Sequence, residues 1–206
     1  RRPKGSRKYP AMILASQSPR RIELLREAGF EFRVIPADVN ERPLPHEDPF
    51  SLVERLACVK AATVLATHAE PSEVVLAADT IVTIDGEVLG KPNDAADARA
   101  MLRRLSGRTH TVATGVCIAR CDEREPRRLS DDELPISFVA KTDVTFYKLS
   151  DEEIDAYIDS GEPMDKAGAY GIQGTGGRML VKGIEGDFYN VVGLPIAEVI
   201  RKLKAL

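Results

Sequence analysis

The sequence predicts a mixed α/β protein whose sheet is partly antiparallel. Signals for helix, strand and turn alternate along the 206 residues, and no internal repeat is present. Two long strand-like runs, 109–119 and 136–148, are joined by a charged connection, and this arrangement favours antiparallel pairing. An Asp-Gly dipeptide at 85–86 between β-branched runs predicts a tight hairpin. We therefore expect helices packed on a mixed sheet and not on a purely doubly wound one.

Local signals mark the ends of most elements. Ser18 followed by Pro19 predicts the start of the first helix. Asp94 is a predicted N-cap, and Ser150 with Glu153 forms a predicted capping box. The predicted helices cover 19–28, 50–68, 95–105, 151–160 and the stretch from 195 onwards. The predicted strands cover 11–15, 31–35, 74–78, 81–84, 87–89, 109–119, 136–148 and 179–184, and the predicted loops cover 36–49, 121–135 and 168–177.

Composition and charge exclude several classes of protein. The net charge of −3 argues against a general nucleic-acid or membrane-surface binder, and no run approaches the roughly 20 apolar residues of a membrane span. The cysteines and histidines show no metal-ligand spacing, so a zinc site is not expected. Cys58 and Cys117 lie in apolar runs, as core residues of a reducing compartment do, and we expect a cytoplasmic protein. The cluster of basic residues within 1–10 predicts a disordered arm. We expect residues 11–206 to form one domain.

Asp79 is the most informative single residue. It directly follows the apolar run 74–78, so we expect it where a buried strand ends. A carboxylate there costs desolvation energy unless a cation or a substrate meets it, and strand C-terminal ends are usual ligand sites in open α/β sheets. The structural alternative is an aspartate held by backbone N–H groups or by an arginine.

A phosphate site is predicted where the first strand runs into the first helix. Ser16 precedes the helix N-terminus, whose free N–H groups attract anions, and Arg20 and Arg21 lie in its first turn. Guanidinium groups bind phosphate oxygens in pairs, although cations are unfavourable at a helix N-terminus without a bound anion. The alternative is a pair of surface arginines.

Two lysines are further candidates. Lys60 falls on the apolar face of its predicted helix, where it either extends along the surface to solvent or reaches a central cleft. Lys91 lies between Gly90 and Pro92, which permit close backbone approach and favour extended geometry, although this is also ordinary loop composition.

An acidic pair predicts a cation site. Glu41 in the proline-rich loop, with Asp38 as a further candidate, could share Mg²⁺ with Asp79 and phosphate oxygens, because Mg²⁺ is usually held this way. The alternative for Glu41 is an ordinary solvated surface acid.

Residues 165–177 form a glycine-dense segment. Five glycines within 168–177 indicate a backbone that needs positive φ or approaches a ligand closely. The segment also contains Lys166 and Gln173, and the Gln173 amide offers a donor and an acceptor that could read a base edge. The alternative is a flexible surface loop.

Five motifs occur in order along the chain: Ser16-x-Ser18-Pro19-Arg20-Arg21, Ala78-Asp79-Thr80, Lys91-Pro92, Leu105-Ser106-Gly107 and Asp165-Lys166-Ala167-Gly168-x-Tyr170-Gly171-Ile172-Gln173. Together they resemble the Maf family of septum-formation-inhibitor-like nucleoside triphosphate pyrophosphatases over residues 11–200, although Gly90 stands where the family commonly has Glu. The resemblance implies a two-lobed α/β fold with a central cleft, related to inosine triphosphatase-like folds. It also implies hydrolysis of a nucleoside triphosphate to the monophosphate and pyrophosphate, often by a homodimer.

The resemblance assigns roles to individual residues. It implies that Asp79 is the base, and it associates Arg20, Thr80 and Gln173 with substrate choice. The Gly-Ile-Gln stretch is similar to the branch that prefers dTTP and UTP. The rival hypothesis is a nucleotide-sensing module that binds without turnover and regulates division or growth.

The expected site therefore has three parts. The expected catalytic residues are Asp79, Lys91 and Glu41, and Glu41 and Asp79 are the expected ligands of Mg²⁺ or Mn²⁺. The expected substrate-binding residues are Ser16, Arg20, Arg21, Lys60, Thr80, Lys166 and Gln173.

Overall fold

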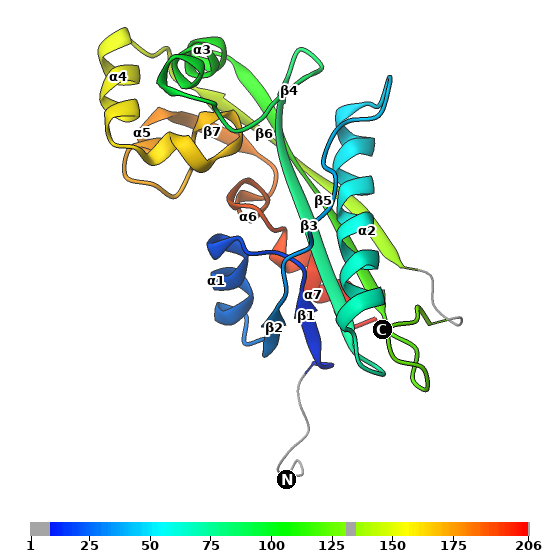
Figure 1. Cartoon of the computed structure of the whole chain (residues 1–206). Coiled ribbons are helices and arrows are strands. Elements are labelled where there is room, and N and C mark those ends of the chain that lie inside the picture. The colour runs from blue at the N-terminus through cyan, green and yellow to red at the C-terminus, as the bar shows by residue number, and fades with distance from the viewer. Residues whose placement is uncertain (1–8, 131–134, 206) are drawn as a thin grey trace.

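A computed structural model describes residues 9–130 and 135–205. One seven-stranded sheet in the order β2-β1-β3-β5-β6-β7, with β4 paired to β3, carries helices on both faces (Figure 1). β1 pairs in parallel with β2 and β3, and the remaining pairs are antiparallel. This mixed sheet confirms the predicted fold class.

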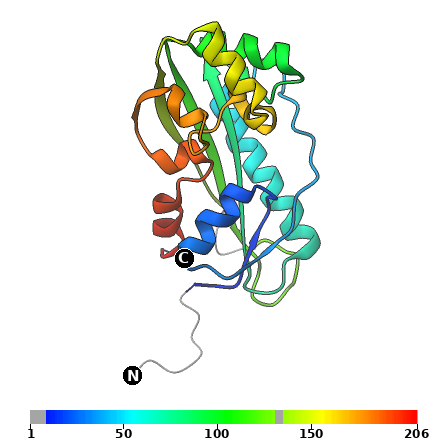
Figure 2. The ribbon, with the colours of Figure 1, turned by 90° about the vertical axis from the view of Figure 1, so that its left-hand side faces the viewer.

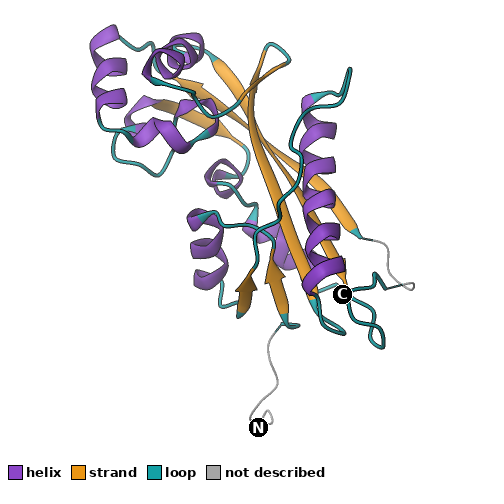
Figure 3. Ribbon diagram, in the orientation of Figure 1, coloured by secondary structure: helices purple, strands orange, loops and turns teal. Residues whose placement is uncertain are grey.

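The elements follow the predicted order, and Figure 3 shows how the three longest strands run through the molecule. The strands are β1 (Met12–Leu14), β2 (Phe32–Val34), β3 (Val74–Ile84), β4 (Glu87–Leu89), β5 (Thr109–Arg120), β6 (Ile136–Phe146) and β7 (Val181–Glu185). The helices are α1 (Pro19–Glu27), α2 (Pro49–His68), α3 (Ala95–Leu105), α4 (Asp151–Asp159), α5 (Gly177–Leu180), α6 (Phe188–Val192) and α7 (Ile196–Leu203), with 3₁₀ turns η1 (Glu162–Asp165) and η2 (Ala167–Ala169).

The two faces of the sheet bury different helices. On one face, α2 packs its alanines 57 and 61 against Val75 and Ala77 of β3. On the other face, Leu76 and Ala78 belong to a core with α1 and α7, while Val82 belongs to a second core with α3 and α4. Figure 2 shows the helices of this second face in front of the sheet and α2 behind it. The two cores form the two lobes that the resemblance implied.

The prediction that Asp79 lies at the end of a strand is wrong. β3 runs without interruption over Val74–Ile84, and Asp79 and Thr80 pair in register with Gly115 and Thr114 of β5. The ladder to β5 satisfies the backbone of these polar residues, so the strand continues through them. Asp79 therefore lies in the middle of a ladder of ten consecutive residue pairs.

The end of the predicted glycine loop was also assigned incorrectly. The strand predicted from Met179 begins at Val181, because Gly177–Leu180 form the helical turn α5. Helix α6 was not predicted; the Asp187 side chain caps it by accepting a hydrogen bond from the Tyr189 N–H. Such short helices have too few turns to produce an apolar periodicity.

Most of the predicted local signals are confirmed. Asp94 caps α3, and Ser150 with Glu153 forms a complete capping box on α4. The hairpin residues Asp85 and Gly86 have φ of 55° and 77°, as an Asp-Gly turn requires.

The structure also bears on the predictions about the N-terminal arm, the cysteines and membrane spans. Tyr9, assigned to the arm, stacks on Phe30 with ring centroids 4.0 Å apart, while residues 1–8 lie outside the described residues. Cys58, Cys117 and Cys121 are all free thiols. Within the described part of the chain, no helix combines the length and the apolar character needed to cross a membrane.

Gly115 of β5 lies close against the backbone of helix α2. An added Cβ there would collide with the Val53 backbone and lie 2.6 Å from the Glu54 nitrogen. We expect Gly115→Ala to destabilise the protein by about 1–3 kcal/mol, because α2 must shift to relieve the overlap. Urea unfolding measures this, with Gly183→Ala as control, since no atom lies within 4 Å of a Cβ built at Gly183. Equal midpoints for the two variants would show that α2 adapts without cost.

Candidate active site

The main cavity lies along an edge of β3 that its neighbours leave uncovered. β1 pairs with Val74–Leu76 and β4 with Val82–Ile84, and no other described strand pairs with this edge between them. A cavity of about 840 Å³ opens there. It is lined by all ten predicted site residues: Ser16, Arg20, Arg21, Glu41, Lys60, Asp79, Thr80, Lys91, Lys166 and Gln173.

Both faces of the sheet contribute side chains to this cavity. Successive residues of a strand point to opposite faces, so Asp79 meets α2 while Thr80 meets α1. Because none of the described strands covers the edge at this level, groups from the two faces border one space. The gap in strand pairing therefore creates the site.

Lys60 joins the two acidic candidates. Its Nζ lies 2.6 Å from Asp79 Oδ1 and 2.7 Å from Glu41 Oε1. The side chain of Lys60 is 11% exposed and that of Asp79 is 15% exposed, so this ion pair is largely shielded from water. Lys60 thus reaches the cleft and does not extend to solvent. Asp38, the other acid considered, does not line the cavity.

Arg21 is fixed from three sides. Its Nε donates to the Gly193 carbonyl (2.8 Å), Nη1 donates to Ser16 Oγ (3.2 Å) and Nη2 donates to Thr80 Oγ1 (2.9 Å). Burial lowers the pKa of Arg21, and the negative charge of Asp79 opposes this effect. An arginine remains a cation at any physiological pH, so a fixed positive charge lies beside Asp79. Thr80 and Ser16 act here by orienting Arg21.

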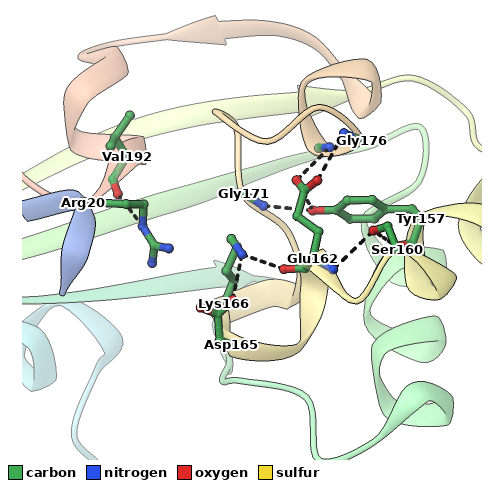
Figure 4. A network of polar contacts seen from close by, with 10 residues as sticks. Arg20, Tyr157, Ser160, Glu162, Asp165, Lys166, Gly171, Gly176 and Val192 are labelled. Atoms are coloured by element: carbon green, nitrogen blue, oxygen red, sulfur yellow. Dashed lines mark hydrogen bonds and ion pairs between the residues drawn. The ribbon is translucent and has the colours of Figure 1, made fainter. Parts of the chain in front are cut away.

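Arg20 forms a single hydrogen bond with the described residues and lines the cavity. Its Nε donates to the Val192 carbonyl over 3.2 Å, as Figure 4 shows, and its terminal nitrogens make no hydrogen bond to other described residues. Across the cavity, the Lys166 ammonium lies 2.7 Å from Asp165 and lowers the pKa of that carboxyl, with a smaller contribution from Arg20. Both arginines line the cavity, so the alternative that they are ordinary surface arginines is wrong.

Lys91 and Gln173 are the last two of the predicted site residues that line the cavity. Both side chains are exposed, line the cavity and have no hydrogen-bond partner within the described chain. The carbonyl of Gly90 accepts a hydrogen bond from the Gly168 N–H over 3.0 Å, which ties the Lys91 segment to the glycine-dense segment. Both side chains thus remain available to a ligand.

Positive φ, one of the two predicted reasons for the glycines of 168–177, holds for a single one of them. Of the five, only Gly168 has positive φ, at 68°. A Cβ at Gly171 would lie 2.6 Å from Lys166 Cδ, and one at Gly176 would lie 2.5 Å from the Tyr157 ring. Gly171 and Gly176 therefore permit close approach of side chains of the protein itself.

Sequence reasoning missed two groups that build the site. The Val192 and Gly193 carbonyls orient the arginine pair from 172 positions away in the chain. Tyr157 and Glu162 contact the glycine-dense segment. The only sequence signal for Glu162 was its position three residues before Asp165, at the start of a recognised motif.

The charges in the cavity suit a polyanionic ligand. Five cationic side chains (Arg20, Arg21, Lys60, Lys91 and Lys166) line it with three carboxylates (Glu41, Asp79 and Asp165). Guanidinium and ammonium groups bind phosphate oxygens, while a carboxylate can accept a proton or bind a cation.

Comparisons with known proteins find similar sequences over almost the whole chain. A dTTP/UTP pyrophosphatase of Koribacter versatilis is 52% identical over 94% of this chain and 93% of its own length. Proteins of the same name from Anaeromyxobacter dehalogenans and Bacillus cytotoxicus are 51% and 50% identical, covering 95% and 93% of this chain and 93% of each relative.

Among solved structures, a HAM1 protein from Coxiella burnetii has a similar fold, with a TM-score of 0.53 and 16% identity over 95% of this chain and 99% of that one. The family model for Maf-like proteins matches residues 11–206. The resemblance noted in the sequence is thereby confirmed, and the chain belongs to the Maf family.

Proposed function

We propose that this protein hydrolyses dTTP and UTP to the nucleoside monophosphate and pyrophosphate. The observation that carries the proposal is that one cavity contains a shielded carboxylate, a fixed arginine pair and an amide able to read a base, from Asp79, Arg20–Arg21 and Gln173. Relatives of about the same length and about half-identical sequence are named dTTP/UTP pyrophosphatases, which supports the same substrates here.

In the proposed reaction, Asp79 is the general base. Its Oδ1 accepts from Lys60, and Oδ2 has no hydrogen-bond partner among the described residues, so Oδ2 is free to accept a proton from water. The water oxygen bonds to the α-phosphorus, and the bond from that phosphorus to the bridging oxygen breaks. Arg20, Arg21 and Lys91 would stabilise the negative charge that develops on the departing pyrophosphate.

We further propose a divalent cation, Mg²⁺ or Mn²⁺, at Glu41 and Asp79. The geometry fits, because both carboxylates already converge on one positive charge, the Lys60 Nζ. The described residues contain no group of three or more His, Cys, Asp or Glu side chains suited to a metal, so phosphate oxygens and water would supply the remaining ligands, as is usual for Mg²⁺. When bound, such an ion polarises phosphate oxygens and neutralises their charge.

The products of dTTP hydrolysis test the proposed reaction. We expect incubation with dTTP and Mg²⁺ to release dTMP and pyrophosphate, because the base and the cations surround one phosphate-binding cavity. Separation of the nucleotides by ion-exchange chromatography distinguishes the alternatives. Release of dTDP and orthophosphate would identify a phosphatase, and binding without any product would identify a sensor.

The role of Glu41 can be tested by titrating the metal. We expect Glu41→Gln to lower activity and to raise the Mg²⁺ concentration for half-maximal rate by at least about tenfold, because a ligand is lost. Asp38→Asn is the matched control, an acid of the same loop that does not line the cavity. An unchanged Mg²⁺ titration in Glu41→Gln would remove Glu41 from the metal site.

A further inference from the structure

The segment 171–177, which carries Gln173, is fastened at its first residue by Tyr157. The Gly171 N–H donates to the Tyr157 hydroxyl over 3.1 Å, and that hydroxyl donates to Glu162 Oε1 over 3.2 Å. Tyr157 is only 4% exposed, and burial raises its pKa, so the hydroxyl keeps its proton and can donate.

The other end of the segment is fastened by Glu162. Oε2 of its carboxylate accepts from the Gly176 N–H (3.2 Å), as Figure 4 shows. Oε1 accepts from the Gly177 N–H (3.1 Å). Hydrogen bonds to an ionised acceptor are stronger than bonds between neutral groups. All the hydrogen bonds of this carboxylate within the described chain go to Tyr157 or to this segment.

The backbone of Glu162 is itself held in place. Its N–H donates to Ser160 Oγ over 3.2 Å, and its carbonyl accepts from Lys166 Nζ over 2.6 Å. The Lys166 stem lies so close to Gly171 that no Cβ fits there. Glu162 therefore connects the end of α4, the lysine of the cavity wall and both ends of the segment (Figure 4).

The position of Gln173 depends on these hydrogen bonds, because the Gln173 side chain makes none of its own with the described residues. It is exposed and makes no hydrogen bond with the described residues, so the position of its backbone sets the region that the amide can reach. Its position lies two residues after Gly171 and three before Gly176, between the two fastened ends.

From this arrangement we infer that Tyr157 and Glu162 are positioning residues for base selection, which hold segment 171–177 so that the Gln173 amide meets the base. The inference rests on the proposed function, in which Gln173 reads the base. Neither residue lines the cavity, so each acts through the segment and not by touching the substrate.

The test is the ratio of kcat/KM for UTP to that for CTP, measured with both substrates in competition. This ratio does not depend on the fraction of enzyme that is folded, so a merely structural defect leaves it unchanged. We expect Tyr157→Phe and Glu162→Gln each to lower the ratio about three- to tenfold, as the loss of one or two hydrogen bonds allows. Tyr147→Phe is the matched control, since Tyr147 is 53% exposed and lies outside the segment.

A double-mutant cycle shows whether the effect passes through Gln173. In the Gln173→Leu background, Tyr157→Phe should produce no further change in the ratio, because the group being positioned is gone. If wild type prefers UTP and both single variants keep its ratio, the inference is overturned while the proposed function stands. If wild type does not hydrolyse UTP, the proposed function itself fails.

Discussion

Asp79→Asn is expected to lower dTTP hydrolysis by on the order of 10²–10⁴-fold, the usual contribution of a general base. The amide is nearly isosteric and its oxygen can still accept from Lys60, while Glu41 keeps its ion pair with that lysine. The fold should therefore persist, while the proton acceptor and one carboxylate ligand of the proposed cation should be lost. Steady-state rates of purified protein at saturating dTTP measure the effect.

Asp159→Asn is the control for this experiment. Asp159 is exposed at the end of α4 and does not line the cavity, so its loss should leave the rate unchanged. If Asp79→Asn keeps more than about a tenth of wild-type activity, well above what loss of a base allows, Asp79 does not accept the proton.

Base selection should depend on Gln173 almost as strongly. Thymine and uracil present an acceptor-donor-acceptor edge, and the Gln173 amide, helped by backbone groups of its segment, can complement part of it. Cytosine places an amino group where uracil has a carbonyl. Each unmatched buried polar group costs roughly 1–3 kcal/mol, or about one to two decades in kcat/KM. We therefore expect dTTP and UTP to be used ahead of CTP, and pyrimidines ahead of the larger purines.

Gln173→Leu should flatten this preference while turnover that depends on Asp79 partly persists. Specificity constants for UTP, CTP and GTP measure the change. The chain contains one other glutamine, Gln17, which lines the cavity next to Ser16, and Gln17→Leu should keep the wild-type ranking. A Gln173→Leu variant that ranks the three nucleotides as wild type does would mean that Gln173 does not read the base.

The outcome for Lys60 shows how far local pattern extends. Helical spacing placed Lys60 on the buried face of its helix, and that is where it lies. The same spacing left two destinations open, because a side chain on that face meets whatever the sheet presents. Only the packing of α2 against β3, with Asp79 on the same face, selects the cleft.

For Asp79, the sequence indicated the chemistry of the side chain but not its position in the strand. Its chemistry was evident from the sequence, since a carboxylate after an apolar run needs a partner, but its place in the strand was predicted incorrectly. The polar pair Asp79–Thr80 looks like an interruption in a local window. In the structure, register with β5 over ten residue pairs carries the strand through it.

The sequence by itself determined most of the elements, several of their caps and the chemical character of the ten predicted site residues, because these depend on neighbours within a few positions. The tertiary structure alone decided three things. It left an edge of β3 uncovered, and it brought the Val192 and Gly193 carbonyls to the arginine pair. It also set Tyr157 and Glu162 at the two ends of the segment that carries Gln173. Each depends on hydrogen bonds that form only after distant segments have packed, so the local periodicity of the sequence cannot predict them.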